Sequence, residues 1–220
     1  MSDEERGAFN PLDKENLGES VARALLKRPI GPIPPKASFD GAGVYAIYYT
    51  GLHRSYGPVR EGNRNDRFAQ PIYVGKAVPK GAMKGGFGLG KSTGNVLFTR
   101  LREHARSIEQ AENLELRDFH CRFLVADDIW IPLGEALLIE WFQPPWNVLL
   151  QGFGNHPTGS RRATQYRSPW DTVHPGRPWA KLLPANPKGQ RTLEKMIADF
   201  FAGKHVPTIS PRDAVTEEEQ

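Results

Sequence analysis

The sequence predicts an α+β fold in which a small sheet is flanked by helices. Three short segments rich in Val, Ile, Tyr and Phe favour strands, at residues 43–49, 71–76 and 117–127. Other segments carry apolar residues at the spacing of a helix, and they lie before, between and after these strands. The chain offers too few alternating strand–helix units for a doubly wound parallel sheet, so we expect helices packed around a small sheet.

Helices are expected at four places. Residues 12–28 come first and end before the proline-rich stretch 29–35, which favours a stiff extended connector. Residues 95–110 carry one stripe of apolar side chains. Residues 132–142 begin with a proline near the first turn, and residues 192–201 form the last helix.

The charge of the chain is distributed unevenly. The formal charge is +4, but residues 1–6 carry −2 and residues 213–220 carry −4, which leaves +10 on the remainder. A basic body with arginines in its loops indicates a polyanionic partner, nucleic acid first, although many basic proteins bind none.

Cysteine and hydropathy indicate a compartment. Cys121 is the only cysteine, which excludes an internal disulfide and a cysteine-based zinc site and suits a reducing cytoplasm. No run approaches the roughly 20 apolar residues that a membrane span needs. The acidic N-terminus lacks the basic-then-apolar order of a signal peptide. We therefore expect a cytoplasmic protein with no membrane partner.

A glycine-rich segment resembles a nucleotide-binding motif. Residues 85–92, GGFGLGKS, match the pattern G-x-x-x-x-G-K-[ST] of a phosphate-binding loop. Such a loop works only when it leaves a buried strand and opens a helix, so that backbone N–H groups meet the phosphates. Here residues 76–84 are loop-like and separate it from the preceding strand. We therefore disfavour NTP hydrolysis and expect a mobile, basic loop over a nucleic-acid backbone.

Two positions on the helix at 95–110 are candidates for chemistry. Arg100 and His104 are four residues apart and share one face. Beside an apolar stripe, the pair has two interpretations, an ordinary surface pair or an electrostatic clamp with a proton carrier. The residues alone leave both open.

Glu135 lies on the core-facing stripe of the helix at 132–142, whereas Glu140 falls on its outer side. A carboxylate on an apolar face is costly unless it is paired or binds a metal. One carboxylate with waters and substrate phosphate oxygens is a usual way of holding Mg²⁺. Asn147 follows in a turn just past the helix, where the local pattern favours a structural role.

These elements carry polar residues in a fixed order. Gly-Val-Tyr ends at Tyr45 on one strand, Tyr-Val-Gly begins at Tyr73 on the next, and the Arg–His pair, the Glu and the Asn follow. This arrangement resembles the GIY-YIG nuclease superfamily over residues 43–147, with Val in both places where the name-giving motif has Ile. GAGVYAIYYTG, PIYVGKAVP, GFGNH and SPWDTVHPGRPWA extend the resemblance to the restriction endonuclease branch that cuts the palindrome CCGCGG.

The resemblance implies an antiparallel sheet on which the two tyrosines face a single active site across adjacent strands. It implies hydrolysis of DNA phosphodiester bonds by water, with Glu135 holding one divalent ion, Mg²⁺ or in its place Mn²⁺. The other implied roles are phosphate neutralisation by Arg100, general base catalysis by Tyr45 with His104 taking its proton, positioning of water and phosphate by Tyr73 and Asn147, and Lys76 as a second candidate for the base.

Double-stranded DNA is the expected partner. The arginines available to guanines or phosphates are Arg161, Arg162, Arg167 and Arg177. A palindromic site favours a symmetric homodimer, with residues 12–35 and 51–70 as the expected dimer or DNA-embracing elements. A cognate DNA methyltransferase is expected in the cell, without direct binding.

Two alternatives remain. A non-restriction GIY-YIG nuclease or a repair-type DNA-binding module on the same fold would give no reason for the extra loops and the C-terminal region. A different metal nuclease built on His156 and His174 would need a ββα unit with a metal-binding histidine in its helix. The loop-like residues 151–180 do not offer one.

The expected organisation has four parts. Residues 1–40 form an N-terminal helix and proline-rich connector, and residues 41–150 form the GIY-YIG nuclease core with inserted loops. Residues 151–212 form a C-terminal DNA-recognition and helical region, and residues 213–220 form an acidic tail.

Overall fold

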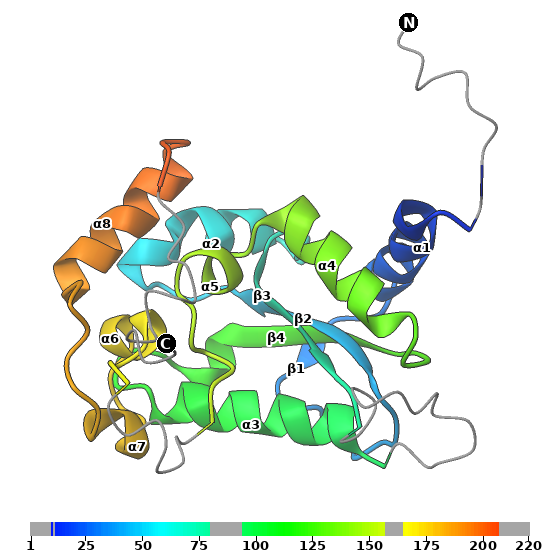
Figure 1. Ribbon diagram of the computed structural model, residues 1–220, viewed down its shortest axis with the longest axis horizontal. Helices are drawn as coiled ribbons and strands as arrows, with labels where there is room; N and C mark the ends of the chain where they lie inside the picture. Colours follow the sequence, from blue (N-terminus) through cyan, green and yellow to red (C-terminus); the bar gives the residue numbers. More distant parts are fainter. Residues whose placement is uncertain (1–9, 11, 80–93, 157–164, 207–220) are drawn as a thin grey trace, which may run out of the picture.

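A four-stranded antiparallel sheet in the order β1-β4-β2-β3 lies at the centre of the chain (Figure 1). β2 (Gly43–Tyr49) pairs with β3 (Pro71–Ala77) on one side and with β4 (Phe119–Val125) on the other. The two-residue β1 (Gly31–Pro32) adds to the outer edge of β4. This arrangement confirms the α+β fold class with a small antiparallel sheet flanked by helices.

The computed structural model describes residue 10 and residues 12–79, 94–156 and 165–206. The glycine-rich pattern at 85–92 and the acidic tail lie outside these residues. None of the helices within the described ranges is long and apolar enough to cross a membrane.

Helices cover both faces of the sheet, which explains why β2 is apolar along its whole length. All seven of its residues are buried. The odd-numbered residues from Tyr45 to Tyr49 face a core built with α3 (Val96–Gln110). The even-numbered residues from Val44 to Tyr48 face a second core built with α1 (Lys14–Leu26) and α4 (Ile131–Phe142). A strand that is buried on both sides has no polar face to show in its sequence.

The bounds of the expected helices and strands differ from the observed ones by at most two residues. Regular structure also occurs where loops or connectors are expected. Gly31 and Pro32 of the connector pair with β4, and an edge strand tolerates proline because its outer N–H groups need no partner. The segment expected as loops at 151–180 contains α6 (Pro169–Val173) and α7 (Pro178–Lys181), each with a proline in its first turn.

The insert between β2 and β3 is helical in part and packs into the core. It contains η2 (Arg54–Tyr56) and α2 (Gly57–Asn63), and Tyr56 and Val59 are fully buried. The remaining elements are η4 (Leu116–Asp118), α5 (Pro145–Val148) and α8 (Gln190–Phe201).

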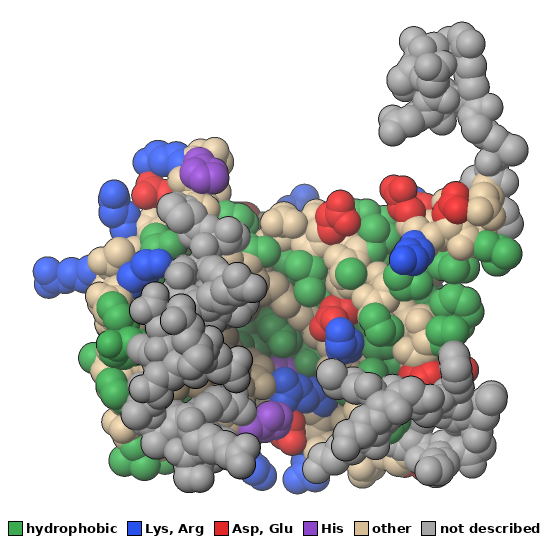
Figure 2. All heavy atoms as spheres, viewed as in Figure 1, with side chains coloured by type: hydrophobic (Ala, Val, Ile, Leu, Met, Phe, Trp, Pro, Cys, Tyr) green, Lys and Arg blue, Asp and Glu red, His purple; other side chains and the backbone are tan. Residues whose placement is uncertain are grey.

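β3 forms the edge of the sheet at which several helices meet. α3, α4 and α5 all contact this strand. Figure 2 shows basic, acidic and histidine side chains gathered at the middle of the face between α3 and α4. The candidate residues, which are far apart in the sequence, are therefore brought together near β3, at the edge of the sheet.

Candidate active site

Tyr45 of β2 and His104 of α3 form a buried hydrogen bond. Tyr45 Oη lies 2.6 Å from His104 Nε2, and each residue is 1% exposed. His104 lies on the core-facing stripe of α3, one turn after Arg100. An ordinary surface pair does not fit this burial, and the interpretation as a proton carrier beside a cation stays a prediction.

Tyr73 lies on the neighbouring strand, diagonal to Tyr45. In the antiparallel register Tyr45 is opposite Gly75 and Ile47 is opposite Tyr73, so the two tyrosine rings share a face, with centroids 6.2 Å apart. A Cβ at Gly75 would stand 2.5 Å from the Tyr45 hydroxyl, which is closer than packing allows. The glycine of Tyr-Val-Gly therefore leaves the room that the Tyr45 hydroxyl occupies.

Arg100 extends from α3 toward the loop that follows α5. Its Nη2 donates to the carbonyl of Gly154 at 2.8 Å, and its Nη1 lies 2.8 Å from His156 Nε2 and donates to Glu103 at 3.1 Å. A Cβ at Gly154 would lie 2.8 Å from Arg100 Nη2 and 3.0 Å from Tyr73 Oη. The guanidinium and the Tyr73 hydroxyl thus both lie against the Cα of Gly154, where a side chain larger than hydrogen would collide with them.

Glu135 faces β3 from α4, whereas Glu140 is exposed. Glu135 Oε2 forms an ion pair with Lys76 Nζ at 2.6 Å, and the two side chains are 20% and 39% exposed. Burial raises the pKa of Tyr45 and of Tyr73, and the Glu135 charge adds to both shifts. The carboxylate is therefore close enough to act on both hydroxyls.

Burial decides the protonation of the Tyr45–His104 pair. It lowers the pKa of His104 well below 6.5, and the charge of Arg100 adds to that effect. It also raises the pKa of Tyr45 well above 10.0, with Tyr73 adding to the shift. At neutral pH His104 is therefore neutral and Tyr45 keeps its proton, and the tautomer of His104 sets which of the two donates the hydrogen bond. In the tautomer with the proton on Nδ1, His104 Nε2 is a proton acceptor for the Tyr45 hydroxyl before any substrate binds.

The acidic residue of the site suits one kind of metal ion. Among the described residues, no group of three or more His, Cys, Asp or Glu side chains could hold a metal. Structural zinc needs four protein ligands, whereas Mg²⁺ is held by one or two carboxylates with waters and phosphate oxygens. Glu135 already faces the Lys76 ammonium, so its surroundings accommodate a positive charge. The residues fit a magnesium-type ion that depends partly on substrate oxygens.

Asn147 binds backbone groups with both ends of its amide. Oδ1 accepts from the Val74 N–H at 2.8 Å, and Nδ2 donates to the Val74 carbonyl at 2.8 Å. Asn147 thereby fastens α5 to β3 between Tyr73 and Gly75, as the structural interpretation of its turn indicates. Its role toward water and phosphate stays a prediction, and this geometry favours an effect through β3.

The arginines expected at DNA lie in different surroundings. Arg161 and Arg162 lie outside the described residues. Arg167 donates from Nε to a backbone carbonyl of α7 at 3.1 Å. Arg177 is 1% exposed and forms an ion pair with the equally buried Asp171. The expectation that Arg177 contacts DNA does not fit this position, because its guanidinium has no access to a ligand outside the fold.

The two histidines of the alternative metal nuclease are engaged separately. His156 contacts Arg100, whereas His174 is fully buried with Nε2 2.6 Å from Tyr56 Oη and Nδ1 2.9 Å from Asn113 Oδ1. A metal site built on this pair of histidines is therefore not supported.

The segment GFGNH, residues 152–156, contributes residues that the sequence-based site prediction does not contain. The Phe153 ring stacks on His104 with centroids 4.4 Å apart and an interplanar angle of 19°. Gly154 and His156 meet Arg100, as described above. The motif itself, two glycines around an aromatic residue followed by Asn-His, is the signal that could have placed this segment at the site.

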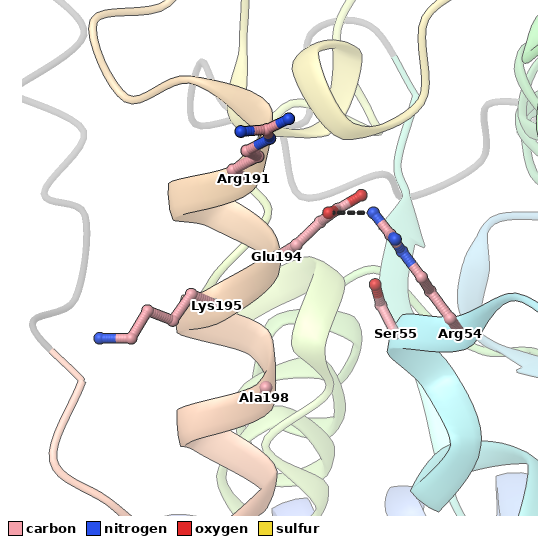
Figure 3. A pocket seen from close by; sticks show the side chains of 6 residues that line it. All are labelled: Arg54, Ser55, Arg191, Glu194, Lys195 and Ala198. Atoms are coloured by element: carbon pink, nitrogen blue, oxygen red, sulfur yellow. Dashed lines mark hydrogen bonds and ion pairs between the residues drawn. The ribbon is translucent and has the colours of Figure 1, made fainter.

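A hollow between η2 and α8 lies away from these residues. Figure 3 shows Arg54 of η2 and Glu194 of α8 reaching toward each other in an ion pair, whereas Lys195 points away. The hollow is lined by Arg54, Ser55, Arg191, Glu194, Lys195 and Ala198. None of the candidate catalytic residues lines it, and its acid is already paired.

Comparison with known proteins identifies the family of the chain. The family model described as the Eco29kI GIY-YIG domain matches residues 37–201, well over half of the chain. This range contains β2, β3, β4 and every candidate catalytic residue. No curated protein matches the chain. The chain belongs to the Eco29kI GIY-YIG family and is a restriction-type endonuclease, an enzyme that binds and cleaves DNA.

Proposed function

We propose that the chain is a type II restriction endonuclease that hydrolyses both strands of double-stranded DNA at CCGCGG with Mg²⁺, or with Mn²⁺ in its place. The observation that carries the chemistry is the buried Tyr45–His104 hydrogen bond, bordered by Arg100, Tyr73 and Glu135. The target sequence is supported by the likeness of GAGVYAIYYTG, PIYVGKAVP, GFGNH and SPWDTVHPGRPWA to the branch that cuts it.

The proposed reaction moves two protons along one line. A water molecule beside Tyr45 Oη gives its proton to that oxygen while its own oxygen attacks phosphorus. The Tyr45 hydroxyl proton moves at the same time to His104 Nε2, which lies 2.6 Å away. The new P–O bond forms as the bond to the 3′-oxygen breaks, and the leaving oxygen takes a proton from solvent. Tyr45 thus stays neutral, which its buried position requires.

The charges of the site complement the phosphate. Arg100 has its guanidinium beside Gly154 and Tyr73 and is partly exposed, so it can neutralise a non-bridging oxygen of a bound phosphate. A divalent ion held by Glu135 would supply charge neutralisation at the phosphate and at the leaving 3′-oxygen. Tyr73 orients water and phosphate from the neighbouring strand.

Lys76 remains the second candidate for the general base. Its Nζ is engaged in the ion pair with Glu135 at 2.6 Å, and an ion pair needs the protonated amine. A protonated amine cannot accept a proton from water. We therefore favour Tyr45 as the base and assign Lys76 to charge balance around the carboxylate.

The proposed assembly follows from the symmetry of the target. One set of catalytic residues cuts one strand, so two subunits related by a two-fold axis cut a palindrome in both strands. Static light scattering on the complex with a single-site duplex should give two subunits per duplex, and affinity should fall steeply as salt rises. In the cell the enzyme would work beside a methyltransferase that protects the same site without contacting it.

Plasmid cleavage with end mapping tests the proposal. Purified protein with Mg²⁺ should give discrete fragments whose ends fall within CCGCGG, and a plasmid without that site should stay intact. Cutting at unrelated sequences would contradict the proposed target and would favour a non-restriction nuclease of the same fold. Binding without any cutting would favour the repair-type module instead.

A further inference from the structure

Arg177 occupies a closed environment next to the active-site loop. The residue precedes α7 and is 1% exposed. Its guanidinium carbon lies 4.6 Å from the ring centroid of Trp170 and 4.7 Å from that of Trp179, between the two indoles. The carboxylate of Asp171, which also accepts from Ser168 Oγ at 2.6 Å, is its counter-ion.

All five N–H donors of Arg177 are used. Nε and Nη2 each donate to the Asp171 carboxylate at 2.6 Å. Nη1 donates to the carbonyls of Phe153 at 3.1 Å and Asn155 at 3.3 Å, and Nη2 also donates to the carbonyl of Gly152 at 2.8 Å. A planar guanidinium with five donors can hold one carboxylate and three separate carbonyls, which an ammonium cannot do.

The three carbonyls belong to the loop 152–156, whose other groups touch the catalytic residues. Phe153 stacks on His104, the Gly154 carbonyl accepts from Arg100, and the His156 ring lies 2.8 Å from Arg100. The loop therefore contacts Arg177 with its backbone on one side and the active site on the other.

We propose that Arg177 is a positioning residue, which holds the loop 152–156 through its carbonyls and thereby orients Arg100 and His104 for cleavage. The inference rests on the proposed nuclease function and adds to it. Arg177 is expected to support the active-site loop from inside the fold, and not to contact DNA as the sequence alone predicts.

Electrostatics supports the same assignment. Burial lowers the pKa of His104 first, Arg100 adds to the effect, and the Arg177 charge adds further. The groups that face His104 or shift its pKa come from every element around it: Tyr45, Tyr73, Arg100, His156 and Arg177. Arg177 thus helps to keep His104 neutral and able to accept the Tyr45 proton.

The variant Arg177→Lys tests the proposal, because it keeps the charge and loses the five-donor fork. We expect the single-turnover rate on a CCGCGG duplex to fall about 100-fold, as for a misplacement of the order of 1 Å. The dissociation constant for the same duplex, measured without divalent ions, should stay within about twofold, because Arg177 touches no DNA.

Two further variants separate positioning from folding. Leu25→Ala removes a buried side chain of α1 on the opposite face of the sheet, and it should lower the melting temperature with an unchanged rate while folded. Arg177→Met combined with Asp171→Leu removes both charges and retains apolar packing, so it should fold yet cleave slowly. All rates are compared at a temperature at which circular dichroism shows each variant folded.

A measurement that does not depend on cleavage completes the test. In NMR spectra of the Arg177→Met/Asp171→Leu variant, amides of residues 152–156 should exchange faster, and the His104 imidazole should titrate at higher pH than in wild type. If wild-type protein cuts no DNA, the proposed function fails, and these spectra still decide on the contact.

Three results would overturn the inference. Weaker duplex binding by Arg177→Lys with an unchanged rate would make Arg177 a DNA contact. An unchanged rate and affinity in folded Arg177→Lys would reduce the residue to a general structural role. Unaltered loop amides and an unaltered His104 titration in the double variant would show that Arg177 does not hold the loop.

Discussion

Two buried tyrosine–histidine pairs lie in the part of the chain that the structure describes, and only one of them belongs to the candidate active site. Tyr45 Oη is 2.6 Å from His104 Nε2, and Tyr56 Oη is 2.6 Å from His174 Nε2. Burial raises the pKa of both tyrosines and lowers the pKa of both histidines. By distance, burial and protonation the pairs are alike.

Their neighbours differ. Trp146 Nε1 donates to Tyr56 Oη at 2.9 Å, and His174 Nδ1 is 2.9 Å from Asn113 Oδ1, so every polar atom of that pair is bound by a neutral partner. The charge of Glu194 acts on Tyr56 from a distance, and that carboxylate is paired with Arg54. The Tyr45 pair has two charges acting on it, those of Arg100 and Glu135. Under the proposed function, a buried Tyr–His hydrogen bond is therefore not sufficient for catalysis. The charged groups around it, which can meet a phosphate, make the difference.

Removing the Glu135 carboxylate should have the largest effect on DNA cleavage. Glu135→Ala should leave no detectable cleavage of a CCGCGG duplex in Mg²⁺, because the site then has nothing to hold the ion, and DNA binding should persist. Gel cleavage and fluorescence anisotropy measure the two. Glu140→Ala, on the outer side of the same helix, is the matched control with a wild-type rate. A dead Glu140→Ala with an active Glu135→Ala would reverse the assignment.

The next largest effect on the cleavage rate should come from replacing His104 by glutamine, and the same change at His174 is its control. Glutamine can accept the tyrosine hydrogen bond but cannot take its proton. His104→Gln should therefore lower the single-turnover rate by about 10²–10⁴-fold, the usual range for a proton-transfer group. His174→Gln should change the rate little while the protein is folded. Equal losses of cleavage rate in both variants would contradict the proposal that only the Tyr45–His104 pair takes part in catalysis.

Asn147 binds β3 and Asn113 binds His174, and replacing these two residues should have different effects on the cleavage rate. Asn147→Ala leaves the Val74 N–H and carbonyl unpaired, and Asn113→Ala leaves His174 Nδ1 unpaired. Each should lower the free energy of unfolding by about 1–3 kcal/mol in chemical denaturation. Only Asn147→Ala should also slow cleavage, because β3 carries Tyr73. Slower cleavage in Asn113→Ala alone would place the wrong region at the site.

Lowering the pH should reduce the free energy of unfolding through both Tyr–His pairs. His104 and His174 have folded-state pKa values well below 6.5, so below that pH the unfolded chain binds more protons. Stability should be full above pH 6.5 and fall by about 1.4 kcal/mol per pH unit for each histidine, down to its folded-state pKa. Urea denaturation between pH 7.5 and 5.5 measures this slope. His174→Gln should reduce it, and an unchanged slope would mean that His174 is not buried in its neutral form.

The fold and much of the candidate site can be predicted from the sequence, because the local residue patterns match the way in which each element packs. β2 and β3 are short apolar runs rich in Val, Ile and Tyr, and Glu135 interrupts an apolar helix face where no acid is expected without a partner. Each signal lies within one element. The Tyr45–His104 contact joins residues far apart in the chain, and the family resemblance supplies it where periodicity cannot.

Arg177 shows why other features could not be predicted. Its sequence context is a loop of a basic protein, which favours exposure, and its burial depends on Asp171, two indoles and three carbonyls that meet only in the folded chain. The pairing of Gly31 with β4 is likewise invisible in a proline-rich connector, because strand pairing depends on the partner edge.

The most direct test of the account compares Tyr45→Phe with Tyr56→Phe. Each variant removes one hydroxyl from an equally buried ring. Single-turnover cleavage and thermal melting are measured on both. We expect Tyr45→Phe to lose most of its rate with specific DNA binding retained, and Tyr56→Phe to melt earlier with a near wild-type rate while folded. A fast Tyr45→Phe enzyme would contradict the account and would move the general base to Lys76.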